Sequence, residues 1–230
     1  IEKTNLQYLD KTFKTIEDLV RAIKEEGKGR TCIEKVMTLC CDVNLSPKNR
    51  IGFRGILEMI YQISEGMFVT EADFETRIRN ANEMLCYCDG NSKENWPYAS
   101  LEYLASQTLV CVIFEAYRNS YVDLAIDAYN LLSSRQKCLS NIKPMQLSLV
   151  YELIGVIWLK HNLDYGLSYL SLATKYDSKN YSAFYFLALL NFHEKHDYVQ
   201  ALTYANQCFA YLPEDASKNI VRDLPQRRRG

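Results

Sequence analysis

The sequence predicts an all-α protein built as an array of helix pairs, and three observations lead to this prediction. Apolar residues recur at helical spacing along most of the chain, and no segment reads convincingly as a strand. Glycine and proline are scarce, at 9 and 5 among 230 residues, which suits long helices joined by short turns. A unit made of a small residue, Leu, a hydroxyl residue and Tyr begins at Gly166 and again at Ala201, thirty-five residues later. A period of this length is typical of helical solenoids.

The N-terminal part of the chain is expected to form four helices without a recognisable repeat. They are predicted near residues 4–26, 31–41, 46–63 and 70–88. The first is expected to end at Gly27, and Pro47 suits the first turn of the third. Thr70 and Asp73 resemble a capping box that starts the fourth helix. The loop at 89–92, rich in Asp, Gly, Asn and Ser, is the expected internal boundary.

The pattern after residue 96 changes to regular helix pairs. Three pairs are predicted near 98–118 and 121–134, 146–160 and 163–176, and 180–194 and 197–211. A longer loop containing Pro144 is expected between the first two pairs. Each returning helix carries a small residue, which lets two helices cross closely: Ala125, then Gly166, then Ala201. Gly166 and Ala201 are therefore expected to be buried at these crossings.

Three regions follow from this organisation. Residues 1–95 form a helical region with no assigned repeat, residues 96–213 form the helix-pair array, and residues 214–230 form a short helix or a basic tail. The chain begins at Ile1 and not at Met, and it ends after three arginines. We expect it to be a fragment of something longer.

The helix pairs resemble tetratricopeptide repeats. The segment 197–202 is similar to the Asp-Tyr-x-x-Ala-hydrophobic element of that family, Cys208 stands where a later alanine is usual, and Leu212-Pro213 matches the closing turn. The Leu-Gly pair of the family is replaced by Ala188-Leu189, and Pro213 has only Ser178 as its counterpart one repeat earlier. The resemblance covers about 110 residues. It implies a right-handed solenoid of antiparallel helix pairs, with about ten helices in the chain.

The resemblance also assigns packing positions to the first helix of each pair. All twelve such positions are apolar or aromatic, as a core between helices requires. They are Leu109, Val112, Ile113 and Ala116, then Val150, Leu153, Ile154 and Ile157, then Tyr185, Ala188, Leu189 and Phe192.

A second row of the same helices would face the concave groove of such an array. This candidate groove is rich in aromatic residues and consists of Val110, Phe114, Tyr117, Tyr151, Trp158, Phe186, Leu190 and His193. Tyr151 and Trp158 are the expected anchors, because Tyr and Trp bury much area at low rotamer cost. The alternative is that residues 1–95 or a neighbouring repeat fill the groove.

These features predict a non-catalytic scaffold that binds a helix or peptide of another protein through an aromatic-rich helical surface. The alternative from another class is an RNA-binding helical-repeat module. It is not favoured, because the candidate groove carries no Lys or Arg to contact phosphates and the net charge is only −1. The three histidines form no known catalytic or metal motif. No Gly-rich phosphate loop or nucleophile elbow is present, so no enzymatic activity and no cofactor are expected.

The eight cysteines lack the paired spacing of a zinc site, and we expect reduced thiols that bind no metal. Cys111 and Cys208 fall in apolar helical stripes and are expected to be buried. No apolar run is long enough to span a membrane. A reducing compartment, the cytoplasm or the nucleus, is the expected location. The oligomeric state and the identity of the partner are left open.

Overall fold

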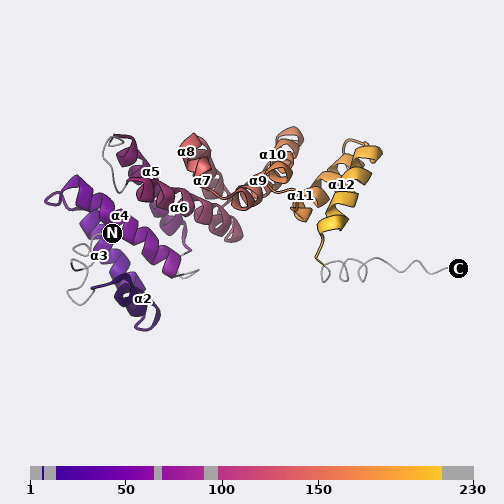
Figure 1. Cartoon of the computed structure of the whole chain (residues 1–230). Helices are drawn as coiled ribbons and strands as arrows, with labels where there is room; N and C mark the ends of the chain where they lie inside the picture. The colour runs from indigo at the N-terminus through magenta and orange to yellow at the C-terminus, as the bar shows by residue number, and fades with distance from the viewer. Residues whose placement is uncertain (1–6, 8–13, 65–68, 91–97, 214–230) are drawn as a thin grey trace. The chain divides into compact units, whose positions relative to one another are not determined.

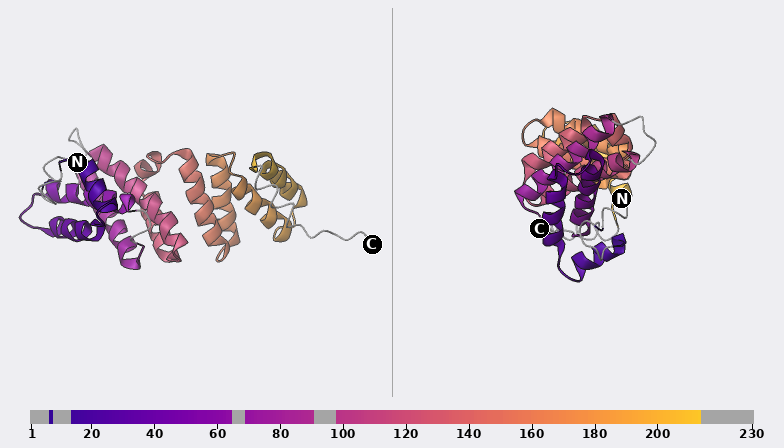
Figure 2. Two further views of the ribbon diagram at one scale, coloured as in Figure 1. Left: turned by 90° about the horizontal axis from the view of Figure 1, so that it is seen from below. Right: turned by 90° about the vertical axis from the view of Figure 1, so that its left-hand side faces the viewer.

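The computed structural model describes residue 7 and residues 14–64, 69–90 and 98–213 (Figure 1). Within these residues the chain forms eleven helices and no strand, which confirms the all-α prediction. The helices can be followed in two further views (Figure 2). They are α2 (Ile16–Lys24), α3 (Gly29–Cys41), α4 (Pro47–Ile63), α5 (Glu71–Gly90), α6 (Tyr98–Arg118), α7 (Val122–Ser133), α8 (Gln136–Ser140), α9 (Pro144–Leu159), α10 (Leu163–Tyr176), α11 (Tyr181–His193) and α12 (Tyr198–Tyr211). The short helix or tail expected after Pro213 lies outside the described residues.

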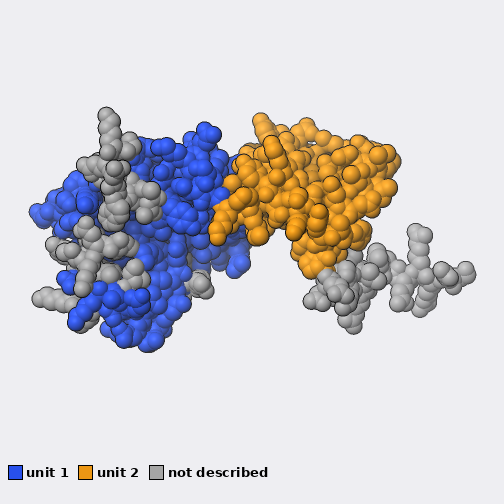
Figure 3. Space-filling view, viewed as in Figure 1, with its two compact units in different colours: residues 1–142 blue, residues 143–230 orange. Residues whose placement is uncertain are grey.

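The chain divides into two compact units, residues 1–142 and residues 143–230 (Figure 3). This division falls later than the boundary that the sequence suggests near residue 95. The helices that flank that point, α5 and α6, pack extensively on each other within the first unit. In the second unit α9 packs on α10, α10 on α11, and α11 on α12.

Local capping chemistry explains where several of the helices start. Thr15 and Asp18 form a capping box at α2, with 3.3 Å from the Asp18 amide to the Thr15 hydroxyl and 3.0 Å from the Thr15 amide to the Asp18 carboxylate. Ser46 accepts a hydrogen bond from the Asn49 amide at 3.2 Å, and Pro47 occupies the first turn of α4. Gly27 has φ +65°, so the turn between α2 and α3 uses the conformational freedom of glycine.

The loop predicted around Pro144 is wrong in two respects. A short helix, α8, occupies residues 136–140, and Pro144 is the first residue of α9. Proline fits this position because the first amides of a helix have no partner within the helix, and because its fixed φ is already helical. Pro144 was expected to lie within the loop, but it begins the next helix.

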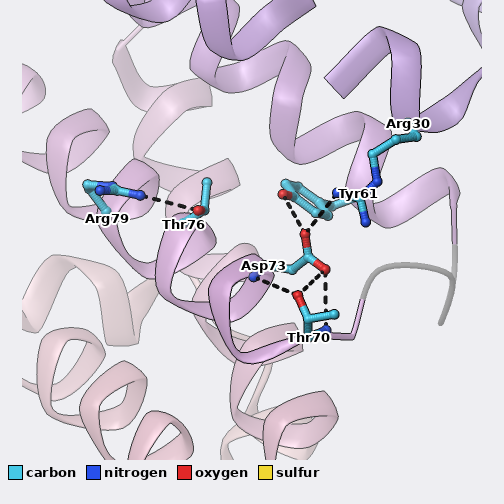
Figure 4. A network of polar contacts seen from close by, with 6 residues as sticks. All are labelled: Arg30, Tyr61, Thr70, Asp73, Thr76 and Arg79. Carbon is cyan, nitrogen blue, oxygen red and sulfur yellow. Dashed lines mark hydrogen bonds and ion pairs between the residues drawn. The ribbon is translucent and has the colours of Figure 1, made fainter. Parts of the chain in front are cut away.

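Asp73 connects three helices of the first unit (Figure 4). Its carboxylate accepts hydrogen bonds from the amide and hydroxyl of Thr70, at 3.2 and 2.7 Å, and its own amide donates to the Thr70 hydroxyl at 3.3 Å. The predicted capping box is therefore confirmed. The other carboxylate oxygen of Asp73 lies 3.4 Å from the Tyr61 hydroxyl and 3.5 Å from Arg30. The cap of α5 is thereby joined to α4 and α3.

A second polar cluster is buried where α4, α5 and α6 meet. Arg77 donates to Glu58 at 3.4 Å and to Glu115 at 2.6 Å, and Asn80 donates to Glu58 at 3.3 Å. Glu58 and Arg77 are buried almost completely. Burial raises the pKa of Glu58 to about 7, although the positive charge of Arg77 opposes this rise. The first unit is thus held by ionic as well as apolar contacts.

The second unit depends on a close crossing of α9 and α10. Gly155 and Gly166 face each other there, and a Cβ atom on Gly166 would meet the side chain of Leu159 and would lie 3.1 Å from the Gly155 carbonyl oxygen. Gly166 and Ala201 are both buried, as predicted. The absence of side chains on the two glycines lets the backbones of α9 and α10 approach.

Candidate protein-binding groove

The eight residues of the candidate concave groove are divided between the two units and differ in burial. Three belong to α6 in the first unit and five to the second unit. Val110 and Tyr151 are buried, Phe114, Tyr117, Trp158, Phe186 and Leu190 are half-buried, and His193 is exposed.

The two expected anchors differ in what they can offer to a partner. Tyr151 lies against rings of its own unit, with centroids 6.3 Å from Tyr169 and 5.2 Å from Tyr176. Burial also raises the pKa of Tyr151 to about 12. Trp158 packs beside Tyr165 at 5.7 Å but keeps part of its surface exposed. Tyr151 therefore serves the interior of its unit, and Trp158 retains surface for a contact.

Another apolar surface lies between α11 and α12, at the last described helix pair. We call it the terminal groove. It encloses about 510 Å³ and is lined by ten residues: Tyr185, Ala188, Leu189, Phe192, Tyr198, Ala201, Leu202, Ala205, Cys208 and Phe209. Six of the ten have large apolar side chains that are exposed to solvent. These exposed apolar side chains lie together around one hollow, which makes the terminal groove the candidate contact site.

Helical spacing places these side chains on one surface. On α12, Tyr198, Leu202, Ala205 and Phe209 follow a four-three-four spacing, so they form one stripe along the helix. The Asp197 side chain caps α12 by accepting the Gln200 amide at 3.0 Å, which fixes where this stripe begins. The groove residues of α11 contact those of α12 through Phe192. Its ring packs edge-on against the ring of Tyr198, with 5.3 Å between the two centroids.

The terminal groove offers apolar contact and almost no other chemistry. None of its ten lining residues is charged. Cys208 also lines the groove and is buried, as predicted. Burial raises the pKa of its thiol, so the sulfur stays protonated. Across the described part of the chain, no group of three or more His, Cys, Asp or Glu residues could hold a metal ion. The arrangement is suited to burying the apolar face of another molecule.

A second hollow, of about 530 Å³, lies among α3, α4 and α5 and is polar. It is lined in part by Arg50, Arg54, Glu83 and Tyr87. Arg54 donates to Asn80 at 2.7 Å and pairs with Glu83, so its charge is engaged within the unit. This hollow has neither the apolar lining nor the exposed rings of the terminal groove.

The terminal groove is not among the surfaces predicted from the sequence, for an identifiable reason. Tyr185, Leu189 and Phe192 were assigned to the core between helices, but in the structure they are exposed. Among the described residues no helix follows α12, so nothing there packs on this side of the last pair. The signal that could have revealed the groove is the apolar stripe from Tyr198 to Phe209 on α12, whose large side chains are exposed to solvent. One further expectation is wrong, since Cys111 is only half-buried.

Comparisons with known proteins add no assignment, since neither protein-family models nor curated proteins match this chain. Among the described helices, none is both long enough and apolar enough to cross a membrane.

Proposed function

We propose that this protein is a non-catalytic scaffold that binds a helix or peptide of another protein. The observation that carries this proposal is the terminal groove, where ten uncharged residues surround about 510 Å³ of solvent-accessible space. The side chains that line it are largely aromatic or aliphatic, and such residues supply most of the binding free energy at protein interfaces. Nothing in this surface resembles a catalytic constellation.

The proposal includes the architecture that the sequence suggested. Residues 98–212 would form a right-handed array of antiparallel helix pairs similar to tetratricopeptide repeats. The packing of each helix of the second unit on the next supports this, as does the recurrence of buried small residues at Gly166 and Ala201. We place the protein in a reducing compartment, the cytoplasm or the nucleus, because its eight cysteines occur as free thiols.

An RNA-binding function receives no comparable support. Tyr185, Tyr198 and Phe209 could stack on unpaired bases, but the terminal groove has no Lys or Arg in its lining. Binding to single strands combines stacking with a basic track that follows the phosphates. We therefore propose protein and not nucleic acid as the partner.

The test compares two substitutions on α12. Leu202 lines the groove, whereas Val199 is 79% exposed, lies outside the lining and serves as a matched control. The intact chain, Leu202→Glu and Val199→Glu would be used as baits in a quantitative capture experiment after nuclease treatment. A charge buried against an apolar partner is costly, so bound proteins should fall at least about ten-fold with Leu202→Glu and persist with Val199→Glu. Equal capture by all three baits would exclude this surface as the binding site.

A further inference from the structure

We infer that the terminal groove takes a single amphipathic α-helix of a partner protein, and not an extended peptide. This inference rests on the proposed function and specifies the shape and chemistry of the partner. Three features support it: the spacing of the groove residues, the absence of backbone hydrogen-bonding groups from the lining, and the way in which α11 itself packs on the preceding pair.

The spacing of the groove residues matches a helical ligand. Tyr198, Leu202, Ala205 and Phe209 recur every three or four residues on α12, and Tyr185, Leu189 and Phe192 do the same on α11. Two helices with such stripes leave a furrow between them, and side chains of a third helix at i, i+3 or i+4, and i+7 fit into it. The stripe from Tyr198 to Phe209 covers eleven residue steps. It therefore spans about 16 Å, which is the length of about three helical turns.

An extended peptide fits this surface poorly. Its backbone N–H and C=O groups would enter a furrow whose walls are two helices, and the backbone groups of a helix interior are already paired within that helix. Unpaired peptide groups that lose contact with water cost free energy, whereas a helical ligand satisfies its own backbone internally. The side chains in the groove offer little compensation, because none is charged and most are hydrocarbon.

The second unit contains an example of such a ligand. Helix α11 packs on α10 and on α12 and has Ala183, Phe184 and Leu187 among its buried residues, with the Phe184 ring 6.2 Å from Tyr204 of α12, while Tyr185 and Phe192 line the terminal groove. The helix that covers the preceding pair thus carries a small, an aromatic and a leucine residue at i, i+1 and i+4. We assign the same pattern to the partner helix, because α11 is a helix with small and large apolar residues at this spacing that packs on a preceding helix of the same unit.

The segment that follows α12 fits this pattern less well. Residues 214–230 contain no aromatic residue, and they include five Lys or Arg and three Asp or Glu. A helix from another protein is therefore the occupant that we propose. Occupation by this segment, or by a second copy of the chain, would be recognised in the experiment below.

The experiment uses two fluorescein-labelled peptides of about sixteen residues and measures fluorescence anisotropy with the intact chain. The helical probe carries Ala, Phe and Leu at the spacing of Ala183, Phe184 and Leu187, repeated one heptad later in a Lys/Glu/Ala background. The second probe has the same composition but two central prolines, which prevent the helix. We expect saturable binding of the helical probe and at least about ten-fold weaker binding of the proline probe. Leu202→Glu should weaken binding of the helical probe to the same degree, and Val199→Glu should leave it within about two-fold.

The other outcomes separate this inference from the function on which it rests. Equal binding of both probes would overturn the helical ligand but keep the groove as a binding surface. A helical probe that binds Leu202→Glu as well as the intact chain would overturn both. If only a chain ending at Pro213 binds the probe, the occupant is the segment 214–230 and the inference of an external partner is wrong. If the intact chain dimerises in sedimentation analysis and Leu202→Glu does not, the occupant is a second copy.

Discussion

The two helix pairs of the second unit have matching apolar positions, but only one pair is covered. Leu167 on α10 is 8% exposed, while its counterpart thirty-five residues later, Leu202 on α12, is 63% exposed. Ile157 on α9 is 3% exposed and the corresponding Phe192 on α11 is 50% exposed. The difference follows from the neighbour, since α11 packs on α10 and no described helix packs on α12 from beyond.

This comparison teaches that an apolar pattern fixes which residues can be buried, and a neighbouring element decides whether they are. In the pair α9–α10 that neighbour belongs to the same chain. In the pair α11–α12 we propose that it belongs to a partner. Substitutions in one helix pair at a time, compared with substitutions in the other pair, test this difference. Their common readout is the fluorescence of Trp158 in a Trp96→Phe background, which reports on the second unit.

The largest effect is expected from Gly166→Leu. The new side chain would collide with Leu159 and with the backbone of α9 at Gly155, so the crossing of α9 and α10 must open. We expect a loss of more than about 3 kcal/mol in the free energy of unfolding, measured by urea titration. Val199→Leu is the control, because Val199 belongs to the same unit and its side chain is 79% exposed. If Gly166→Leu leaves the stability unchanged, the two backbones are not in close contact at this crossing.

Removal of the same side chain from both pairs tests the comparison directly. Leu167→Ala empties a covered position and should cost about 3 kcal/mol, whereas Leu202→Ala removes an exposed side chain and should change stability by less than about 0.5 kcal/mol. Urea denaturation of both variants gives the two values under identical conditions. Similar losses at the two positions would mean that α12 is covered in solution by part of this chain or by another copy.

The contact of α11 with the preceding pair can be weakened at Asn180. Its side chain caps α11 by accepting the Ala183 amide at 3.0 Å, and it donates to Ser148 and Glu152 of α9, both at 2.9 Å. Asn180→Ala should cost about 2 kcal/mol, because it removes the cap and the polar links together. Hydrogen exchange should then increase in α9 and α10 as their cover loosens. Unchanged protection of these helices would show that α11 is held by its apolar face alone.

A smaller loss of stability than at Gly166 is expected at its counterpart, Ala201. Ala201 lies at the base of the terminal groove, so a larger side chain there can extend into open space. We expect Ala201→Leu to cost about 1 kcal/mol, clearly less than Gly166→Leu. It should also reduce the binding of the helical probe, because the new side chain fills part of the groove. A loss of stability as large as that of Gly166→Leu would place Ala201 in a closed crossing.

Most of the secondary structure could be predicted from the sequence, because helical periodicity and caps are local. The spacing of apolar residues and Pro47 predicted the bounds of α4, and Thr70 and Asp73 predicted the start of α5. The helix α8 was missed since it has only five residues and no periodic stripe, and Pro144 can either end a helix or begin one. Both errors arise because the same local sequence is compatible with a loop and with a helix.

The candidate site could be predicted less well, because exposure depends on distant parts of the chain. The same pattern that buries Ile154 leaves Leu189 exposed, and no property of either residue distinguishes them. Tyr151 was expected to face a partner, but Tyr176 from the neighbouring helix already lies against its ring. The division into two units near residue 142 also depends on which helices pack together, and not on the composition of a linker.

The buried carboxyl group of Glu58 makes folding of the first unit a proton-uptake reaction. In the unfolded chain this group titrates near its ordinary pKa of 4.5, whereas burial in the folded unit raises its pKa to about 7. Between pH 4.5 and about pH 7 the folded state binds more protons than the unfolded state. The contribution of Glu58 to the free energy of unfolding is therefore complete below the unfolded pKa and is lost as the pH rises to the folded pKa. The enthalpy of unfolding measured at pH 6 should consequently change with the ionisation enthalpy of the buffer, and Glu58→Gln should remove that dependence. The first unit thus exchanges protons with its surroundings close to neutral pH.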